Sequence, residues 1–410
     1  MKILVVDNML QPFEPDSVPG GTERRNISDA VSLAQEGHEV FLTVAMPREA
    51  FVDYNTHHRV RLWCLHTEGK EATKDQPRSW QKNVIRRIDA YLKEFGKPEV
   101  VHYGCNSFYW LAKHLMIKHK LPLSTQIGNY LSGNAMYDLG RLRDLFLLKS
   151  LGANFVANTS TCEKKFQGQI ESMRDKGFLK DLPYPNDEPL FDHVNRNNAG
   201  VGFVGNTIDG SIRSDRGFAV IAARADPAKK VGMFAKVKFP LRVFLKYRPS
   251  SDKNDYFKKL VAKLESNPNI KVIVDADYNR IMLSMSRARA VIVSWPDETF
   301  GLTAFEAASF GVTSCVFRRA PDDANATHEF LAEIDDPPQF AYNDREWKDK
   351  LEKFMTREST DEERLHRAAR LRIRYGYDDY VNERVSALKS AIRKFKQLNA
   401  SSTTSRKKAL

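Results

Sequence analysis

The sequence predicts an α/β protein made of two domains, each built around a parallel β-sheet. The chain of 410 residues is too long for one ordinary core. Short runs of branched apolar residues alternate with longer segments of helical periodicity, and the alternation starts again after a polar stretch at residues 187–200, the expected linker. Such alternation is typical of βαβ units, in which helices cover both faces of a parallel sheet and ligands bind beyond the carboxyl ends of the strands.

The first domain, residues 1–190, begins with an apolar run that Asp7 closes. This run is a predicted strand and is too short for a signal peptide, so a cytoplasmic location is expected. Gly20 and Gly21 precede a helix whose predicted N-cap is Thr22, where backbone N–H groups would face an anion, although an ordinary turn fits the glycine pair equally well. Strands are expected at 2–7, 38–45 and 98–104, and helices at 22–37 and 107–119.

The second domain, residues 200–375, repeats the alternation. Strands are expected at 201–205, 218–223, 241–246, 270–276, 289–295 and 312–317, with helices at 256–266 and 278–288. A helix at 376–398 follows and is expected to pack back across the domains through an apolar stripe of Val385, Leu388, Ile392 and Phe395. The basic segment 399–410 lacks periodicity and is expected to be mobile.

Composition excludes several classes of protein. Hydrophobic residues at 42% and charged residues at 28% are typical of a soluble protein, and no apolar run approaches the roughly 18 residues of a membrane span. A net charge of +12 favours an anionic partner, and the chain has no acidic residue after Glu383. Neither a disulfide framework nor a zinc knuckle is indicated by the four widely separated cysteines, Cys64, Cys105, Cys162 and Cys315.

Two cations follow the apolar run 218–223. Arg224 and Lys229 lie five residues apart across Pro227, so both can project from one loop at a strand end. Arginine binds phosphate oxygens bidentately and lysine adds a mobile charge, a combination that suits a diphosphate and stabilises a departing phosphate. A solvated loop is the alternative interpretation.

Two glutamates stand eight positions apart in PDETFGLTAFEAASFG, residues 296–311. Glu298 lies on a loop after a predicted strand, whereas Glu306 lies in the first turns of a helix that begins at Gly301 and Leu302. Carboxylates accept hydrogen bonds from paired hydroxyls, and the N–H groups between them would face phosphate. A nucleotide sugar offers this pattern of hydroxyls, diphosphate and ribose.

The order of GGTE at 20–23, EGHEV at 36–40, ARADPAKK at 223–230 and ETFGLTAFE at 298–306 resembles the retaining family 4 glycosyltransferases of GT-B fold. The resemblance spans most of the chain. It implies two Rossmann-like domains that face each other across a cleft, with C-terminal helices, and a UDP-, GDP- or ADP-sugar as donor substrate. It also implies retention of configuration without a metal or other cofactor, with catalysis by positioning and electrostatic stabilisation.

Transferred by position, the resemblance assigns roles to this chain's residues. Arg224 and Lys229 would bind the donor diphosphate, Glu298 the hydroxyls of the transferred sugar and Glu306 the donor ribose. Donor phosphate would also meet the backbone at Gly20, Gly21, Phe300, Gly301 and Leu302.

The chain departs from the family in the first-domain loop that follows the expected strand within the segment 121–134. The family often has a histidine in this loop, whereas this sequence has Gln126, Gly128 and Asn129. Asn129 is one candidate on the acceptor side. His102, at the end of a predicted strand, is another, and a structural role for this histidine is at least as compatible with the sequence.

Asp275 and Asp277 form a DxD pattern, which in the other large glycosyltransferase fold holds a divalent cation. Solvated turn acids are the alternative, and they agree with the GT-B resemblance. No metal ligand is therefore predicted for the reaction.

The acceptor is indicated only by charge. A polyanion is expected, most specifically a hydroxymethylated pyrimidine in DNA, flipped out of the duplex and positioned through phosphate contacts. A second hypothesis is a peripheral membrane enzyme of polysaccharide or glycolipid synthesis, which would dock basic helices at 140–152 or 390–398 on anionic lipid. A third is a catalytically silent module that binds a nucleotide or nucleic acid.

Overall fold

The computed structural model describes residues 1–7, 21–44, 59–64, 77–104, 109–127, 130–180, 182, 189–195, 214–247, 254–298, 301–335 and 337–408. The chain divides into two compact units. Of the described residues, those up to 195 and those from 378 onward belong to the first unit, and residues 214–377 belong to the second. No helix in the described ranges is long and apolar enough to cross a membrane.

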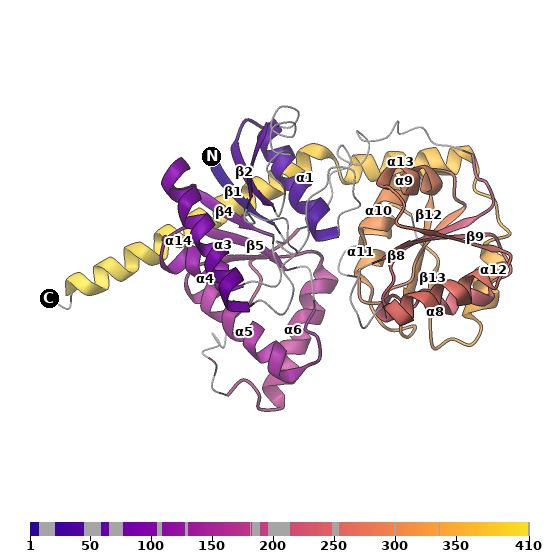
Figure 1. Ribbon diagram of the computed structural model, residues 1–410, viewed down its shortest axis with the longest axis horizontal. Helices are drawn as coiled ribbons and strands as arrows, with labels where there is room; N and C mark the ends of the chain where they lie inside the picture. The colour runs from indigo at the N-terminus through magenta and orange to yellow at the C-terminus, as the bar shows by residue number, and fades with distance from the viewer. Residues whose placement is uncertain are drawn as a thin grey trace. The chain divides into compact units, whose positions relative to one another are not determined.

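The first unit holds a parallel sheet of seven strands in the order β3-β2-β1-β4-β5-β6-β7 (Figure 1). Its strands are β1 (Lys2–Val6), β2 (Glu39–Val44), β3 (Val60–Cys64), β4 (Val100–Tyr103), β5 (Leu123–Ile127), β6 (Asn154–Ala157) and β7 (His193–Val194). Its helices are α1 (Gly21–Gln35), α3 (Pro77–Phe95), α4 (Tyr109–Ile117), α5 (Ala135–Ser150), α6 (Ser160–Asp175) and, from residue 378, α14 (Tyr377–Lys408).

The central strand β1 shows why this sheet forms. Its side chains alternate between faces, and Leu4 and Val6 join the apolar cluster formed with α3, α4, α5 and α6. Ile3 and Val5 point to the opposite face and are also fully buried. A strand covered on both faces needs a continuous apolar run, which is what residues 2–6 provide.

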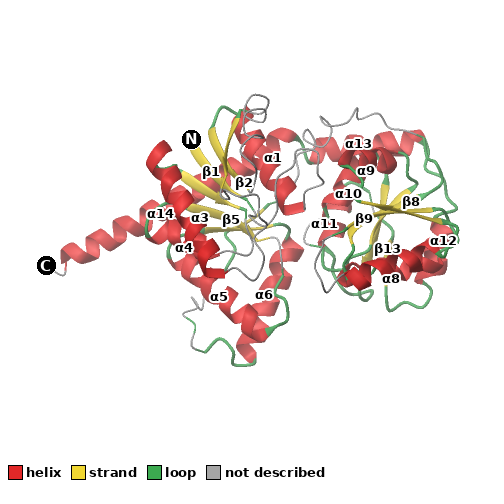
Figure 2. Ribbon diagram, in the orientation of Figure 1, coloured by secondary structure: helices red, strands yellow, loops and turns green. Residues whose placement is uncertain are grey.

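The second unit holds a parallel sheet of six strands in the order β10-β9-β8-β11-β12-β13 (Figure 2). Its strands are β8 (Ala219–Arg224), β9 (Leu241–Lys246), β10 (Ile270–Val274), β11 (Ala290–Val293), β12 (Thr313–Arg318) and β13 (Gln339–Ala341). Its helices are η2 (Pro227–Lys229), η3 (Val231–Lys236), α8 (Asn254–Glu265), α9 (Tyr278–Ser286), α10 (Leu302–Ser309), α11 (Ala326–Leu331), α12 (Trp347–Phe354) and α13 (Asp361–Arg374).

Apolar layers cover both faces of the second sheet. Helices α8 and α12 lie on one side, where Leu260 and Leu351 pack with the strands, and α9, α10 and α13 lie on the other, with Met285 and Ala307 (Figure 1). The predicted α/β fold with two parallel sheets is confirmed. The strand expected at 201–205 lies outside the described residues.

The predicted linker at 187–200 is wrong in its first half. Leu190 and Phe191 are buried in the first core, and β7 pairs with β6. The polar composition of the stretch hid the two large apolar side chains, whose burial attaches the segment to the first unit.

The last helix is longer than the predicted helix at 376–398. Helix α14 continues to Lys408, through most of the expected mobile tail at 399–410, and no glycine or proline interrupts it. Of its predicted apolar stripe, Leu388 is buried and Phe395 packs against the first core. At the other end of the chain, α1 begins at Gly21, so Thr22 lies inside the helix and not at its N-cap.

Candidate active site

The strand order of the second sheet reverses between β8 and β11, which are paired neighbours with helices of opposite faces behind them. In open parallel sheets, the loops that follow the strands on either side of such a reversal diverge and leave a ligand site at the strand ends. Here the two loops are tied together by the Ser294 hydroxyl, which donates to the carbonyl oxygen of Lys229 over 2.7 Å.

These two loops bring Lys229 and Glu298 together. The Lys229 ammonium donates to Glu298 Oε1 over 2.9 Å and lies 3.6 Å from the centroid of the Trp295 ring. The side chains of Lys229 and Glu298 are 14% and 24% exposed, so the pair is largely shielded from water but reachable. Partial desolvation strengthens the attraction of this ammonium for an anionic ligand.

Arg224 is the last residue of β8 and is exposed. A tight turn joins it to Lys229, because the Asp226 N–H donates to the Arg224 carbonyl over 2.8 Å and the Lys229 N–H donates to the Asp226 carbonyl over 2.9 Å. The Asp226 carboxylate also accepts from the Ala228 N–H and so caps η2. Within the described ranges no ion pair engages the Arg224 guanidinium.

The loop that carries Glu298 is held from three directions. Asn325 donates through its side-chain amide to the carbonyl oxygens of Pro296 and Phe317, over 3.3 and 2.9 Å. The Tyr342 hydroxyl donates to the Ser294 carbonyl over 2.5 Å. Arg319 pairs with Asp297. These bonds fix the loop relative to β12, α11 and β13, so that Glu298 is presented from a rigid support.

Helix α10 begins with free backbone donors. Gly301 is its N-cap, in the left-handed region at φ 88°, and no side chain caps the helix. The first helical bonds run from Ala304 and Phe305 to the Gly301 carbonyl. A side chain at position 301 is also excluded by space, because a Cβ there would lie 2.3 Å from Thr327 Oγ1. Leu302, partly buried, is the first residue of the helix, whose N-terminus offers an anion its N–H groups and its dipole.

Glu306 lies in the second turn of α10 and is only 4% exposed. Its Oε1 accepts a hydrogen bond from the Tyr278 hydroxyl over 3.0 Å. Tyr278 is the first residue of α9, directly after its N-cap Asp277. The carboxylate is therefore held between two helices on the face of the sheet that α9 and α10 cover.

The structure thus joins Lys229 to Glu298 directly and places Arg224 one turn before Lys229. It places Gly301, Leu302 and Glu306 at the start of the helix that follows the Glu298 loop. Among the other predicted residues, Gly21 begins α1 in the first unit. Gly20, Asn129 and Phe300 lie outside the described residues.

His102 is engaged elsewhere, in a buried cluster of the first unit. It is 5% exposed, and its Nε2 lies 2.9 Å from the carboxylate of Asp29, which is fully buried. Asp29 also accepts from the Tyr380 hydroxyl and from Arg384 Nε at 2.6 Å. Burial alone would raise the pKa of Asp29, but the charge of Arg384 and the hydrogen bond and charge of His102 outweigh it and lower that pKa. These contacts favour the structural interpretation of His102.

The two acids of the DxD pattern have local backbone roles. Asp275 lies in the left-handed region at φ 47°, and its carboxylate accepts from the Tyr247 N–H over 2.9 Å. Asp277 caps α9 by accepting from the Arg280 N–H over 2.7 Å. Both bonds are typical of turn acids and helix caps. The geometry therefore favours the alternative interpretation, in which the two aspartates are turn acids.

Sequence reasoning missed the residues that support the pair. Trp295 was assigned to the preceding strand, yet β11 ends at Val293 and the ring lies beneath the Lys229 ammonium. Tyr278 and Asn325 were not identified at all. Trp295 could have been found from its place at a strand end, beside Pro296, whereas the other two act through contacts 28 and 29 residues away in sequence.

No model of a known protein family matches the sequence, and no curated protein matches it significantly. Solved structures do match over nearly the whole chain. HepE from Anabaena in complex with UDP and glucose is 14% identical, with a TM-score of 0.64, covering 95% of this chain and 100% of its own. Sucrose-phosphate synthase from Thermosynechococcus elongatus is 12% identical, with a TM-score of 0.64, covering 97% and 99%.

The catalytic domain of starch synthase IV from Arabidopsis thaliana, bound to ADP and acarbose, is 11% identical, with a TM-score of 0.64. It covers 95% of this chain and 99% of its own. Identities this low establish architecture and not activity. The chain has the GT-B fold of these glycosyltransferases.

Proposed function

We propose that the protein is a retaining glycosyltransferase that takes a sugar from a nucleotide-sugar donor. The observation that carries this proposal is the Lys229–Glu298 pair at the β8/β11 reversal, beside the uncapped N-terminus of α10. One shielded ammonium, one carboxylate and a set of free backbone donors at one sheet edge suit a diphosphate linked to a polyol.

In the proposed reaction, Lys229 and Arg224 neutralise the diphosphate as it departs, together with the backbone N–H groups at Gly301 and Leu302. Glu298 accepts hydrogen bonds from hydroxyls of the transferred sugar, and Glu306 from the donor ribose. The acceptor oxygen bonds to the anomeric carbon on the face from which the diphosphate leaves. A phosphate oxygen takes the acceptor's proton, so configuration is retained without a protein base.

The solved structures with the same fold support the class of donor. HepE was crystallised with UDP-glucose and with UDP, and starch synthase IV with ADP. The proposed donor is accordingly a UDP-, ADP- or GDP-sugar. Lys229, Arg224 and the N-terminus of α10 would bind the diphosphate and not the base. They therefore suit all three classes of donor.

Incubation of the pure protein with each nucleotide sugar tests the activity. Release of free nucleotide that Lys229→Ala abolishes supports the proposal, and binding without any turnover supports the silent alternative. Proton NMR of the transferred sugar then tests retention, since an inverted anomeric signal would rule out the same-face reaction. Metal-independent chemistry predicts full turnover after chelation, and a requirement for added manganese would refute it.

For the acceptor we propose a polyanion, most specifically a hydroxymethylated pyrimidine in DNA. Besides the net charge of +12, Lys389, Arg393 and Lys396 are exposed on α14 at spacings of four and three, so they share one face of the helix. Other cations of α14 have partners: Arg384 pairs with Asp29, and Lys394 with Asp192.

Docking on anionic lipid through residues 140–152 has less support. Arg141 is buried and donates to the Tyr130 carbonyl over 2.8 Å, and Lys149 is buried against Asp192 at 2.6 Å. Of the three cations in this segment, only Arg143 is exposed to a membrane surface. Binding of modified duplex DNA that weakens steeply with salt, and weakens again when Lys389, Arg393 and Lys396 are changed to Gln, supports the DNA acceptor. Failure of any sugar to reach that DNA refutes it.

A further inference from the structure

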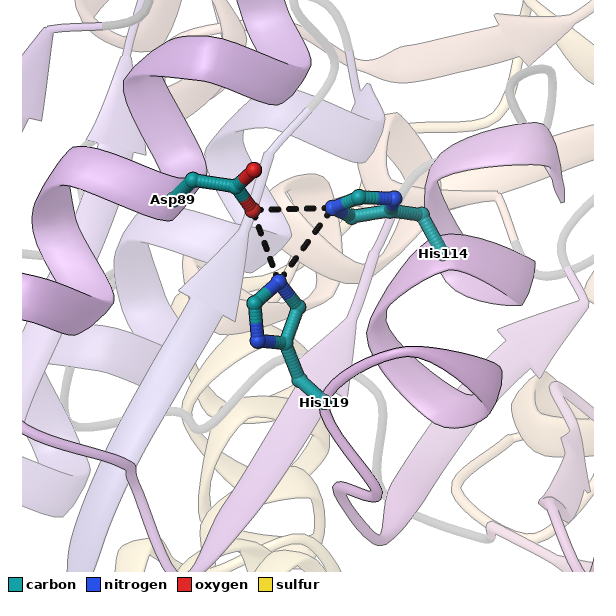
Figure 3. Close-up of side chains that lie close together, drawn as sticks. All are labelled: Asp89, His114 and His119. Carbon is teal, nitrogen blue, oxygen red and sulfur yellow. Dashed lines mark hydrogen bonds and ion pairs between the residues drawn. The ribbon is translucent and has the colours of Figure 1, made fainter.

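A cluster of three potential metal ligands lies in the first unit. Asp89 projects from α3, His114 from the last turn of α4 and His119 from the turn that follows α4 (Figure 3). The three side chains point toward one another, with Asp89 Oδ1 2.9 Å from His114 Nε2 and 2.7 Å from His119 Nε2. The two Nε2 atoms are 3.3 Å apart.

These distances approach those of one face of a tetrahedral coordination sphere. Zinc binds imidazole nitrogen and carboxylate oxygen at roughly 2.0–2.2 Å, which places two ligand atoms of a tetrahedral site about 3.3 Å apart. The separation of the imidazole nitrogens has this value, and the oxygen lies a few tenths of an ångström closer to each nitrogen. Small side-chain rotations would therefore complete the triangle.

Hydrogen bonds alone explain the triangle less well. If Asp89 only accepted from both rings, each Nε2 would carry a proton, and two N–H donors would stand 3.3 Å apart with their hydrogens directed at one oxygen. A cation above the plane of the triangle instead receives the lone pairs of both nitrogens and of Oδ1. One bound ion would then explain why these three ligand atoms, from three separate segments, converge.

The surroundings suit a bound divalent cation. The other carboxylate oxygen of Asp89 accepts from Lys118 Nζ over 2.8 Å, which turns Oδ1 toward the imidazoles, as hydrogen-bonded carboxylate ligands are commonly held. The side chains of His114 and His119 are 14% and 15% exposed and that of Asp89 31%, so water can reach a fourth position.

We propose that Asp89, His114 and His119 form a binding site for a divalent transition-metal ion, with Zn²⁺ as the best fit and water as the fourth ligand. Two imidazoles and one carboxylate form a ligand set that zinc accepts and that calcium and magnesium, which prefer oxygen, do not. The ion would tie α3 to the α4–β5 connection, joining residues 25 and 30 positions apart in sequence. The site serves stability and takes no part in the proposed sugar transfer.

Metal binding tests this directly. After the full-length protein has been stripped with chelator and dialysed against zinc, one tightly held ion per chain is expected. The double variant His114→Gln, His119→Gln should bind more than about 100-fold more weakly, and Asp89→Asn should also weaken binding while keeping the side-chain shape. His366→Gln removes an exposed histidine of the second unit, as a matched control, and should bind zinc like the parent protein.

A second measurement needs no further variant. Cobalt added to the stripped protein should give the intense visible absorption of a tetrahedral site, and zinc should raise the melting temperature of the parent but not of the double variant. Circular dichroism checks that each variant is folded. Failure to bind stoichiometric zinc, an octahedral cobalt spectrum, or equal affinity in the double variant would overturn the proposal.

Discussion

The two units have the same topological reversal but use it differently. In the second unit, the loops after β8 and β11 present the partly exposed Lys229 and Glu298, beside a helix start without a side-chain cap. In the first unit, the strands at the reversal are β1 and β4, and His102 of β4 is bound to the buried Asp29. The last helix adds Tyr380 and Arg384 to this carboxylate and seals it.

The difference teaches that strand order alone does not make a binding site. Near both reversals, charged groups lie in contact with one another. In the first unit the charges are paired away from water, so removal of one partner would leave a buried charge without its counter-ion. In the second unit they remain accessible and face free backbone donors, an arrangement that can still bind a ligand.

The largest effect is expected from breaking the buried cluster. Asp29→Ala leaves Arg384 and Arg25 buried without their carboxylate, and should lower the free energy of unfolding by about 3–5 kcal/mol. Urea denaturation measures the change. Asp144→Ala breaks the pair with Lys113, whose side chains are 22% and 27% exposed, and should cost less than about 1 kcal/mol. Equal losses in the two variants would mean that the buried cluster stabilises the fold no more than the more exposed pair does.

At the reversal of the second unit, a substitution is expected to lower activity and to change stability little. Lys229→Ala should lower the rate of donor turnover about 10²–10³-fold, because the cation that stabilises the departing diphosphate is gone, while stability changes little. Lys236→Ala removes an exposed lysine of η3 and serves as the control, with an unchanged rate. Turnover within twofold of the parent in Lys229→Ala would contradict the role of this residue.

Gly301→Ala tests the start of α10. Alanine pays about 1–2 kcal/mol for the left-handed backbone and a further 1–3 kcal/mol for the contact with Thr327. Gly37→Ala is the matched control, because Gly37 has φ 81° and open space around its Cα, so only the first cost applies. Thermal denaturation compares the two. Stability that falls equally in both variants would show that Thr327 yields without cost.

The smallest effect concerns His119 in the metal-free protein. Burial lowers the pKa of this ring below its unfolded value of about 6.5, despite the opposing carboxylate of Asp89, so the unfolded chain binds the proton first. Stability should therefore fall as the pH drops through about 6.5. Chelator-treated His119→Gln should lose part of this dependence. A pH profile identical to that of the parent would mean that His119 contributes nothing to it.

The sequence predicted β8, β9, β10, β11 and β12 of the second sheet, most clearly β11 and β12, which are apolar and buried, but it missed β13. It also predicted that Lys229 and Glu298 follow strands whose loops could meet, and the two residues do lie in contact across 69 positions. Periodicity and spacing locate the strands and the residues that follow them. Because ligand sites in open parallel sheets lie beyond the carboxyl ends of the strands, residues that follow two such strands can be expected to meet.

The partners of other charged residues were not predictable from local patterns. Asp29 is bound by Arg384 from 355 positions away, and Lys394 by Asp192 from 202 positions away. His114, His119 and Asp89 have no sequence signature, because the residues come from two helices and a turn whose packing brings them together. Pairs of this kind form through tertiary structure. The composition and periodicity of a segment do not indicate which distant residue it will contact.

The central claim is that the β8/β11 reversal binds the diphosphate of a nucleotide sugar. A thermal-shift panel of UDP-, GDP- and ADP-sugars with the parent protein, Lys229→Ala and Lys236→Ala tests it most directly. The account predicts that at least one donor raises the melting temperature of the parent and of Lys236→Ala but not that of Lys229→Ala. A panel without any shift, or an equal shift in Lys229→Ala, would contradict it.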